Sequence, residues 1–490
     1  MASSKKRKLG SLFEIGPSSI LENQKKVDML KGQYDGSMSC GKEDSGCYKM
    51  ILSPFKVCTL NNIFKEETAL GLLSELQDME FIFKENDLLS LHQTVDLNDV
   101  NSNFISKTRE FIYTRLKSVI EDVTGSKFND TVDMHGIKFM QHNNLLCHSD
   151  CLDTRHTAFI LYLVPKTWNS DFGGSLDLFN CDENYVPTDI ECSIFPSFNS
   201  FSFFRVSQFS WHQVSEILED EIRWSISGWF HSDKPPIILP KYDSVLRSIS
   251  EPVPGDVETL QSWISLKYLN VEINTEIQQQ FQEDSEVSLE NFLLPEKYAL
   301  LCEELSAMKW KVVGPRNKQY YKTSDKPLVT VSEFLDLLKS DAFAVLLSHC
   351  TGLPLSKQYD DPDCTEFSEN AFGIMSLTLS RWESGFYTLL HDQETVDLPE
   401  RLHLFYHADL YEKYDVDAGG YISFISHSDE EPLLVVPPQN NTLSLVFTRP
   451  DEFGFTKYIN SKLQKPYYCF NGEYLPRKPL AEISSDPEDT

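Results

Sequence analysis

The chain contains Gly173-Gly174-Ser175-Leu176-Asp177-Leu178-Phe179, and a similar stretch, Gly419-Gly420-Tyr421-Ile422-Ser423-Phe424-Ile425, follows in its second half. A turn with proline and asparagine comes about two dozen residues after each glycine pair, first at 196–199 and then at 438–441. Similarity between two parts of one sequence indicates repeated structural units. We therefore expect two copies of one β-rich domain.

Around the first glycine pair, short apolar runs with alternating character predict β-strands. These runs cover Thr157–Val164, Ser175–Phe179, Ser200–Val206, Trp211–Ile217 and Arg223–His231. Two amphipathic stretches precede them, one at Glu67–Phe81 and one that follows the capping cluster at 101–103 and ends at Gly125. Helices followed only by strands are typical of an α+β fold, here a β-sandwich or jelly roll buttressed by helices.

The second half of the chain follows the same plan. Helical patterns at Glu296–Met308 and Ser332–Leu347 come before strand patterns at Leu402–Phe405, Tyr421–Ile425, Leu433–Val436, Thr442–Thr448 and Phe453–Ile459. The predicted boundaries are a disordered basic and polar tail over 1–45, a first domain over 46–234, a linker over 235–270, a second domain over 271–477 and an acidic tail over 478–490.

The 490 residues carry a net charge of −30. This excess disfavours direct nucleic-acid binding, which depends on clustered Lys and Arg, and favours a basic macromolecular partner. No apolar run is long enough to span a membrane, and the 11 cysteines lack the paired spacing of a zinc or disulfide framework. The cluster Lys5-Lys6-Arg7-Lys8 has no apolar segment behind it, so we expect an intracellular protein in which this cluster could serve nuclear import.

The main chemical signal is His148-Ser149-Asp150, followed by His212. Alone, this tripeptide also fits a turn whose aspartate accepts local hydrogen bonds. On an extended segment, however, His148 and Asp150 point to the same side, and a histidine from a later strand can complete one face of an octahedral metal site. We predict that His148, Asp150 and His212 bind Fe(II), leaving two positions for 2-oxoglutarate and one for O2.

Arg223 begins the predicted strand Arg223–His231 and shares one face of it with Ser225 and Ser227. An arginine inside a barrel needs an anion, because burying an unpaired charge is costly. The distal carboxylate of 2-oxoglutarate is a suitable partner, since a guanidinium group binds carboxylates through two hydrogen bonds. Tyr162 could donate its hydroxyl to the same carboxylate, or it could be a core tyrosine bonded to the backbone.

The other histidines fit a metal site less well. His427-Ser428-Asp429 repeats the tripeptide, but no histidine follows it in the chain. His391-Asp392 has the wrong spacing for a shared face, and Gly454 occupies the place that His212 has relative to the asparagine turn. We therefore expect the second domain to bind no iron. His231 is a rival third ligand in the first domain, although no strand arginine follows it.

Taken together, these residues resemble the ribosomal prolyl 3-hydroxylase family. The resemblance rests on residues 145–150, 159–165, 173–178, 212–216 and 223–231, and on 381–382 and 387–392 in the second half. It implies two tandem double-stranded β-helix domains, each buttressed by helices, of which only the N-terminal one is catalytic. It also implies iron ligands at His148, Asp150 and His212, with 2-oxoglutarate contacts at Tyr162 and Arg223.

The resemblance further implies a substrate and a location. The family modifies a proline of a small-subunit ribosomal protein near the decoding centre, which predicts peptidyl-proline 3-hydroxylation here, an effect on translation, and residence in cytoplasm and nucleus. Fe(II), 2-oxoglutarate and O2 would take part, with ascorbate supporting activity. Two alternatives stay open: another 2-oxoglutarate oxygenase activity such as lysyl hydroxylation or demethylation, or a non-catalytic scaffold in translation or mRNA decay.

Overall fold

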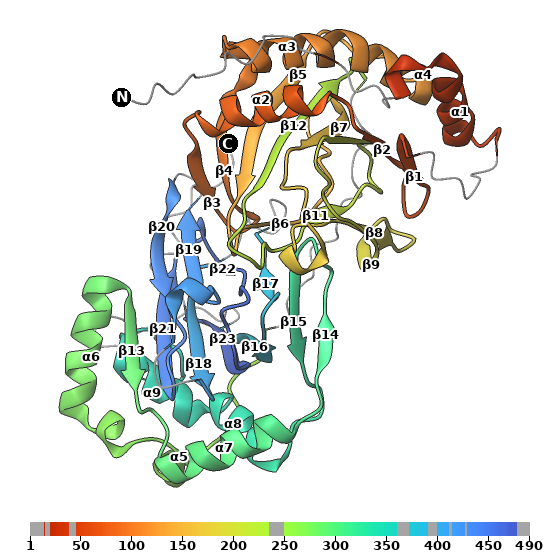
Figure 1. Cartoon of the computed structure of the whole chain (residues 1–490). Coiled ribbons are helices and arrows are strands. Elements are labelled where there is room, and N and C mark those ends of the chain that lie inside the picture. The colour runs from red at the N-terminus through yellow and green to blue at the C-terminus, as the bar shows by residue number, and fades with distance from the viewer. Residues whose placement is uncertain are drawn as a thin grey trace, which may run out of the picture. The chain divides into compact units, whose positions relative to one another are not determined.

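A computed structural model describes residues 14, 20–38, 46–234, 249–359, 372–390, 399–410, 414–426 and 429–477 (Figure 1). The chain divides into two compact units: Met1–Lys241 with Pro315–Asn317, and Tyr242–Gly314 with Lys318–Thr490. Each unit combines curled antiparallel sheet with helices, which confirms the expected α+β class. Among the described residues, no helix has the length and apolar character needed to cross a membrane.

The first unit begins with helices and strands that alternate. Its helices are α1 (Gln24–Asp35), α2 (Glu66–Gln77), α3 (Asn103–Phe111) and α4 (Lys117–Thr124), with a π-helical turn at Ile112–Leu116 joining the last two. Its strands are β1 (Tyr48–Ile51), β2 (Val57–Asn61), β3 (Ile82–Glu85), β4 (Leu89–Asp96), β5 (Val132–Phe139), β6 (Asn144–His148), β7 (Arg155–Tyr162), β8 (Leu176–Cys181), β9 (Pro187–Ile194), β10 (Ser200–Arg205), β11 (His212–Val214) and β12 (Arg223–His231).

These strands form one 12-stranded sheet in the order β1-β2-β10-β7-β12-β5-β4-β6-β11-β8-β9, with β3 added to β4. Side chains alternate across β7, so that Phe159 and Leu161 pack with Leu72 of α2 and Ile105 of α3, while Ile160 packs in a separate cluster with strand residues. Helices α2 and α3 lie over the outer face of the β5–β12 region (Figure 1). The apolar outer face is thereby covered, and the opposite face is left for the site.

The second unit has the helices α5 (Val257–Trp263), α6 (Val271–Asp284), α7 (Pro295–Ala307), α8 (Val329–Leu338) and α9 (Asp341–Thr351). Its strands are β13 (Glu286–Glu290), β14 (Lys311–Val313), β15 (Gln319–Thr323), β16 (Gly373–Trp382), β17 (Tyr387–Thr388), β18 (Arg401–Ala408), β19 (Ile422–Ser426), β20 (Asp429–Val436), β21 (Thr442–Thr448), β22 (Glu452–Thr456) and β23 (Tyr467–Leu475). They form an 8-stranded sheet, β13-β21-β18-β23-β16-β15-β14 with β17 on β15, and a 3-stranded sheet, β20-β19-β22.

The two units share a strand order. The run β2-β10-β7-β12-β5 of the first corresponds to β13-β21-β18-β23-β16 of the second, and β11-β8-β9 corresponds to β22-β19-β20. The asparagine turns also match: Asn199 (φ 61°) bonds both backbone groups of Phe64, and Asn441 (φ 48°) bonds both backbone groups of Leu293. Each asparagine lies just before one strand, β10 or β21, and binds the segment that follows the strand paired with it, β2 or β13.

Two predicted segments contain structure that the sequence pattern did not indicate. Residues 20–38, expected within a disordered tail, include helix α1, whose Val27 and Leu30 are buried in the same cluster as Val123 of α4. The described part of the expected linker, 249–270, includes α5 and a 3-10 turn, with Trp263 and Tyr268 buried in the second unit's core. Both segments are ordered because a few apolar residues in polar surroundings find a core to pack against.

Two other expectations were wrong in detail. The helices do not all precede the strands, because β1 and β2 come before α2, and β3 and β4 come between α2 and α3. The stretch Ser332–Leu347 is not one helix, because α8 ends at Leu338 and Ser340 caps α9 by accepting the backbone N–H of Phe343. The Lys5–Lys8 cluster and the acidic tail 478–490 lie outside the described residues.

Asn199→Ala should lower the free energy of unfolding of the first unit by about 2–4 kcal/mol. The change removes the two hydrogen bonds that the Asn199 side chain makes to the Phe64 N–H and C=O, and it places alanine at positive φ. A urea titration followed by tryptophan fluorescence would show a lower midpoint. Asn199→Gly is the control, since it keeps the backbone conformation accessible and loses only the hydrogen bonds, so it should fall between the two proteins. An unchanged midpoint in Asn199→Ala would contradict this account.

Candidate metal centre and anion pocket

Two histidines meet because two strands pair. His148 is the last residue of β6 and His212 is the first residue of β11, and the antiparallel register places them opposite each other. Their ring centroids lie 4.2 Å apart. Strand β11 is held in this position from the other side by β8, where His212 pairs with Leu178.

Asp150 joins these histidines from the loop that follows β6. Its φ of 62° lies in the left-handed region, where an aspartate is tolerated better than most residues. This turn places Oδ1 3.6 Å from His148 Nε2 and Oδ2 3.4 Å from His212 Nε2. The three candidate ligand atoms lie within 4.8 Å of one another, and Asp150 and His212 are buried.

Both imidazole rings are oriented by backbone carbonyls. His148 Nδ1 lies 2.8 Å from the carbonyl oxygen of Leu146, and His212 Nδ1 lies 2.7 Å from that of Ser210. A carbonyl can only accept a hydrogen bond, so each Nδ1 carries the proton and donates it. Each Nε2 therefore presents its lone pair to the space beside Asp150, as a metal ligand requires.

The ionisation of the cluster favours the same interpretation. Burial, reinforced by His212, lowers the pKa of His148 to about 4, although Asp150 opposes the shift. Burial alone would raise the pKa of Asp150, but its interactions with His212 and His148 outweigh this and lower it. Near neutral pH the cluster thus holds a neutral imidazole and a carboxylate. Two imidazole nitrogens and one carboxylate form the donor set of non-heme Fe(II) oxygenases, so the residues present fit an iron ion.

Sequence reasoning missed two residues beside this cluster, Arg155 and Trp229. Arg155, the first residue of β7, has Nη1 3.9 Å from Asp150 Oδ1, and its guanidinium carbon lies 3.7 Å from the centre of the Trp229 ring. The cation–π contact with Trp229 positions the Arg155 side chain, so that its positive charge lies near the Asp150 carboxylate. The available signal was that Arg155 follows Asp150 by only five positions and comes shortly before the predicted strand Thr157–Val164.

A second group of buried polar atoms surrounds Arg223. This side chain is 1% exposed, and its Nε donates to the carbonyl oxygen of Gly174 at 2.9 Å. Among the described residues, no hydrogen-bond partner lies in reach of Arg223 Nη2, of the Tyr162 hydroxyl or of Ser225 Oγ. The Arg223 guanidinium carbon lies 5.0 Å from the centre of the Tyr162 ring. A buried guanidinium, a phenol and a hydroxyl without partners fit one carboxylate ligand.

The glycine pair shapes this pocket. Gly173 and Gly174 have φ of 68° and 67°, which favours glycine at both positions. A Cβ at Gly173 would lie 2.0 Å from the Glu216 carbonyl oxygen, and one at Gly174 would lie 2.9 Å from Arg223 Cδ. The sequence used this pair only as a landmark of the repeat. In the structure it also provides the carbonyl that orients Arg223.

The other candidate histidines are placed elsewhere. His231 Nδ1 lies 2.9 Å from Thr154 Oγ1, and its Nε2 lies 3.2 Å from Asp133 Oδ2 without forming a hydrogen bond, so the ring lies outside the cluster of His148, Asp150 and His212. His142 pairs with Glu216 at 2.8 Å. His391-Asp392 and His427-Ser428 lie outside the described residues.

The second unit has different residues at the matching positions. Phe424 pairs with Gly454 as Leu178 pairs with His212, which confirms that glycine stands in the place of the distal histidine. Tyr467 begins β23 as Arg223 begins β12, and its hydroxyl donates to the Gly420 carbonyl oxygen at 2.8 Å. The guanidinium of Arg223 thus corresponds to a phenol whose hydroxyl proton is donated to a backbone carbonyl.

His407 completes this comparison, because it pairs with Thr442 and Cys469 as Tyr162 pairs with Ser200 and Ser225. Burial lowers the pKa of His407 to about 3, so the ring is neutral near pH 7. Neither His407 nor Tyr467, which stand at the positions of Tyr162 and Arg223, therefore carries a positive charge near pH 7.

Comparisons with known proteins place these features in a wider context. Residues 134–231 match the model of the 2OG-Fe(II) oxygenase superfamily, and residues 255–479 match the model described as oxoglutarate and iron-dependent oxygenase degradation C-term. The chain is 33% identical to prolyl 3-hydroxylase OGFOD1 of Mus musculus, over 89% of this chain and 90% of that one. It is 32% identical to the Xenopus laevis protein of the same name, over 92% of each chain. It is 27% identical to prolyl 3-hydroxylase sudestada1 of Drosophila melanogaster, over 95% of this chain and 92% of that one.

His212→Ala should abolish iron binding, because it removes one of three ligands from a site that is already half open. Full-length protein would be loaded with Fe(II) under anaerobic conditions, desalted and measured for iron by mass spectrometry. We expect about one iron per unmodified chain and almost none in the variant.

His231→Ala is the matched control and should keep its iron, because His231 lies outside the cluster. Iron retained in His212→Ala but lost in His231→Ala would move the third ligand to residue 231. About two irons per unmodified chain would contradict a metal-free second unit.

Proposed function

The chain belongs to the prolyl 3-hydroxylases of the 2-oxoglutarate- and Fe(II)-dependent oxygenase superfamily, and from that premise we propose which of its residues hold the metal and cosubstrate and which protein it modifies. It is therefore an enzyme that acts on prolyl residues of a protein, which excludes a purely non-catalytic scaffold. The comparisons also favour proline over the lysyl hydroxylation and demethylation that the metal ligands alone would allow.

His148, Asp150 and His212 hold Fe(II) in this proposal. The observation that carries it is the orientation of both imidazoles, whose Nδ1 protons are bonded to backbone carbonyls while both Nε2 atoms face Asp150. With 2-oxoglutarate and O2, the bound metal supplies the oxidation of an unactivated C–H bond, and 2-oxoglutarate is converted to succinate and CO2. The protein keeps the imidazole of His148 neutral and the carboxylate of Asp150 charged, and Arg155 lies beside that carboxylate.

Arg223 and Tyr162 bind the distal carboxylate of 2-oxoglutarate in this proposal. Their unpartnered Nη2 and hydroxyl groups are buried, so a carboxylate there would restore hydrogen bonds that the protein alone leaves unmade. Ser225 Oγ, two residues along the same face of β12, is a further donor to the same group. Gly174 orients the guanidinium toward this position through the bond to Arg223 Nε.

The substrate that we propose is a prolyl residue, hydroxylated at carbon 3, in a basic small-subunit ribosomal protein, with a consequence for translation. The family resemblance supports this choice, and a net charge of −30 favours association with a basic protein over direct contact with nucleic acid. We place the protein in cytoplasm and nucleus, with Lys5–Lys8 as the candidate import signal.

For the fold, we propose that each unit is a double-stranded β-helix and that the second is a non-catalytic copy of the first. The shared strand order, the matching asparagine turns and the glycine pairs with positive φ support this relationship. Gly454 and Tyr467, at the positions of His212 and Arg223, explain why the copy would bind neither iron nor 2-oxoglutarate.

Arg223→Ala should weaken 2-oxoglutarate binding by about 2–5 kcal/mol, because it removes a charge-assisted pair from a buried site. Tyr162→Phe should weaken it by only about 0.5–1.5 kcal/mol, since one neutral hydrogen bond is lost and the shape is kept. Calorimetric titration of 2-oxoglutarate into metal-loaded protein measures both effects. Val164→Ala, a nearby core change without a polar group, serves as the control. Unchanged affinity in both variants would remove 2-oxoglutarate from this pocket.

The substrate proposal predicts a mass increase of one oxygen on a proline. Full-length enzyme would be incubated with small-subunit ribosomal proteins, Fe(II), 2-oxoglutarate and ascorbate, and the products would be sequenced by tandem mass spectrometry. Asp150→Asn is the matched control, because it keeps the side-chain shape and removes the carboxylate charge. Modification of lysine instead of proline would contradict the assignment. Hydroxylation of prolines only in other proteins would overturn the ribosomal substrate alone.

A further inference from the structure

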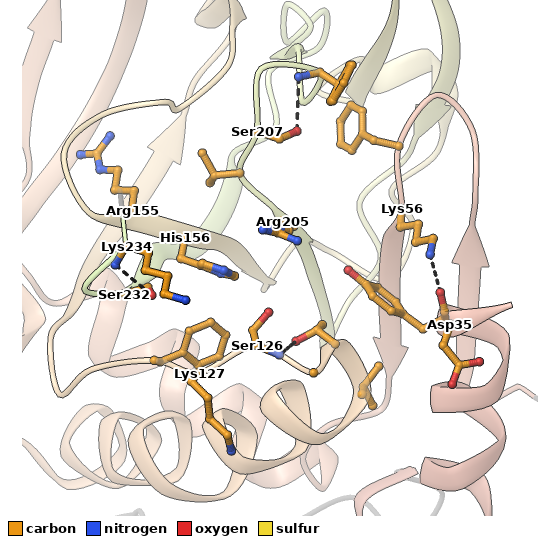
Figure 2. A pocket seen from close by; sticks show the side chains of 18 of the residues that line it. Asp35, Lys56, Ser126, Lys127, Arg155, His156, Arg205, Ser207, Ser232 and Lys234 are labelled. Atoms are coloured by element: carbon orange, nitrogen blue, oxygen red, sulfur yellow. Dashed lines mark hydrogen bonds between the residues drawn. The ribbon is translucent and has the colours of Figure 1, made fainter. Parts of the chain in front are cut away.

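A large groove opens on the first unit beside the metal centre. It encloses about 1100 Å³ and is lined by residues from α1, the β1–β2 and α4–β5 segments, the start of β7, the end of β10 and the end of β12. Figure 2 shows Arg205 and His156 in its middle, Arg155 and Lys234 on one side, and Lys56 on the other. This volume exceeds that of most small-molecule pockets and suits a chain segment.

The charge of the groove is opposite to that of the whole protein. Its acidic lining residues are Asp35 and Asp233, whereas its basic ones are Lys31, Lys56, Lys127, Arg155, Arg205 and Lys234. Of these, Lys31 and Lys127 are paired with Asp122 and Glu121 outside the groove. The contrast with a net charge of −30 shows that positive charge is concentrated here.

Three cations of the groove, Lys56, Arg205 and Lys234, form no ion pair among the described residues. Arg205 is exposed at the end of β10, whereas Lys56 donates to the backbone carbonyl of Tyr34, lies 4.9 Å from the centre of the Tyr34 ring and interacts electrostatically with Asp35. Burial, and then the charge of Arg205, lower the pKa of His156, so the positive potential of Arg205 reaches into the groove. An anion entering the groove would meet charges that the protein itself leaves unneutralised.

The groove is connected to the metal centre through shared residues. Arg155 lines the groove and lies 3.9 Å from Asp150. Ser207 also lines it, and its backbone N–H donates to Ser210 Oγ, while the Ser210 carbonyl accepts the Nδ1 proton of His212. A polypeptide that presents a proline to the metal would therefore continue into this groove.

We propose that the groove binds the segment of the substrate polypeptide adjacent to the target proline and selects segments that carry Asp or Glu. This proposal rests on the proposed function, because it assumes that the metal centre acts on a polypeptide. The carboxylates would be recognised by Arg205 and Lys56, and Arg155 would sit where the segment meets the metal centre. Phe55, Phe128 and Phe209 provide apolar surface for the intervening residues.

The global charge decides against a nucleic acid as the occupant. A single strand carries a negative charge at every nucleotide and extends beyond the groove, where a protein of net charge −30 repels it. A peptide with a few carboxylates places its charges only where the cations are. A basic ribosomal protein can satisfy both requirements, since an acidic segment would occupy the groove while the basic remainder faces the acidic surface.

The test compares three fluorescein-labelled peptides that share one proline-containing core and differ in a flank of three Glu, three Gln or three Lys, placed at either end. Binding to full-length protein would be measured by anisotropy, and hydroxylation by mass spectrometry. We expect the Glu peptide to bind about tenfold more tightly than the Gln peptide at low salt. This preference should shrink as salt rises, because exposed charges are screened.

Matched variants locate the effect. Arg205→Glu and Lys56→Glu should each weaken binding of the Glu peptide by roughly three- to fivefold while leaving the Gln peptide little changed. Lys84→Glu makes the same charge change as Lys56→Glu on β3, outside the groove, and should leave the preference intact.

Equal binding of the Glu and Gln peptides, or an equal effect of Lys84→Glu, would overturn the proposal. Tighter binding of a single-stranded RNA of similar length would overturn it as well, in favour of nucleic acid. Binding preference without hydroxylation of any peptide would support the groove's selectivity and count against the proposed function. Hydroxylation of all three peptides without a binding preference would support the proposed function and overturn the groove's selectivity for acidic segments.

Discussion

Strands β6 and β11 pair with His148 opposite His212, and this register is the constraint on which the site depends. Side chains alternate along a strand, so a slip by one residue would turn one histidine away from the other. The register is held because β11 also pairs with β8, whose approach depends on the glycine pair at Gly173 and Gly174. The same pair orients Arg223, so one local backbone feature positions both the metal ligands and the anion pocket.

Burial gives these polar residues their chemical character. Removal from water keeps His148 neutral, and the unpartnered atoms of Arg223 and Tyr162 make a carboxylate ligand favourable. The cost of leaving such groups unpaired is offset by the apolar core on the outer face of the sheet, where Phe159 and Leu161 pack under the helices. One face of strand β7 thus packs in the apolar core, and the opposite face contributes Tyr162 to the pocket.

The second unit keeps the scaffold without these functional groups. Its asparagine turn and glycine pair have the same backbone role as in the first unit, whereas Gly454, Tyr467 and His407 stand at the positions of His212, Arg223 and Tyr162. The backbone features are needed for the fold, and the side chains are needed only for chemistry, so the second set can change without loss of the first. Charge is also distributed unevenly, because the groove beside the metal centre is basic although the whole protein is acidic.

The sequence by itself determined the α+β class and the strands around the site, including β12 at Arg223–His231, because alternation and glycine–asparagine turns are local signals. It also identified His148, Asp150, His212, Tyr162 and Arg223 as the candidate site, since their residue types and spacing carry chemistry. Only the tertiary structure brought His212 within 3.4 Å of Asp150 and showed His231 engaged elsewhere. It alone placed helix α1 in the core, because contacts between distant segments do not follow from residue spacing. It alone brought Arg155, Arg205 and Lys56 to one groove, because the net charge of a chain does not say where its charges lie.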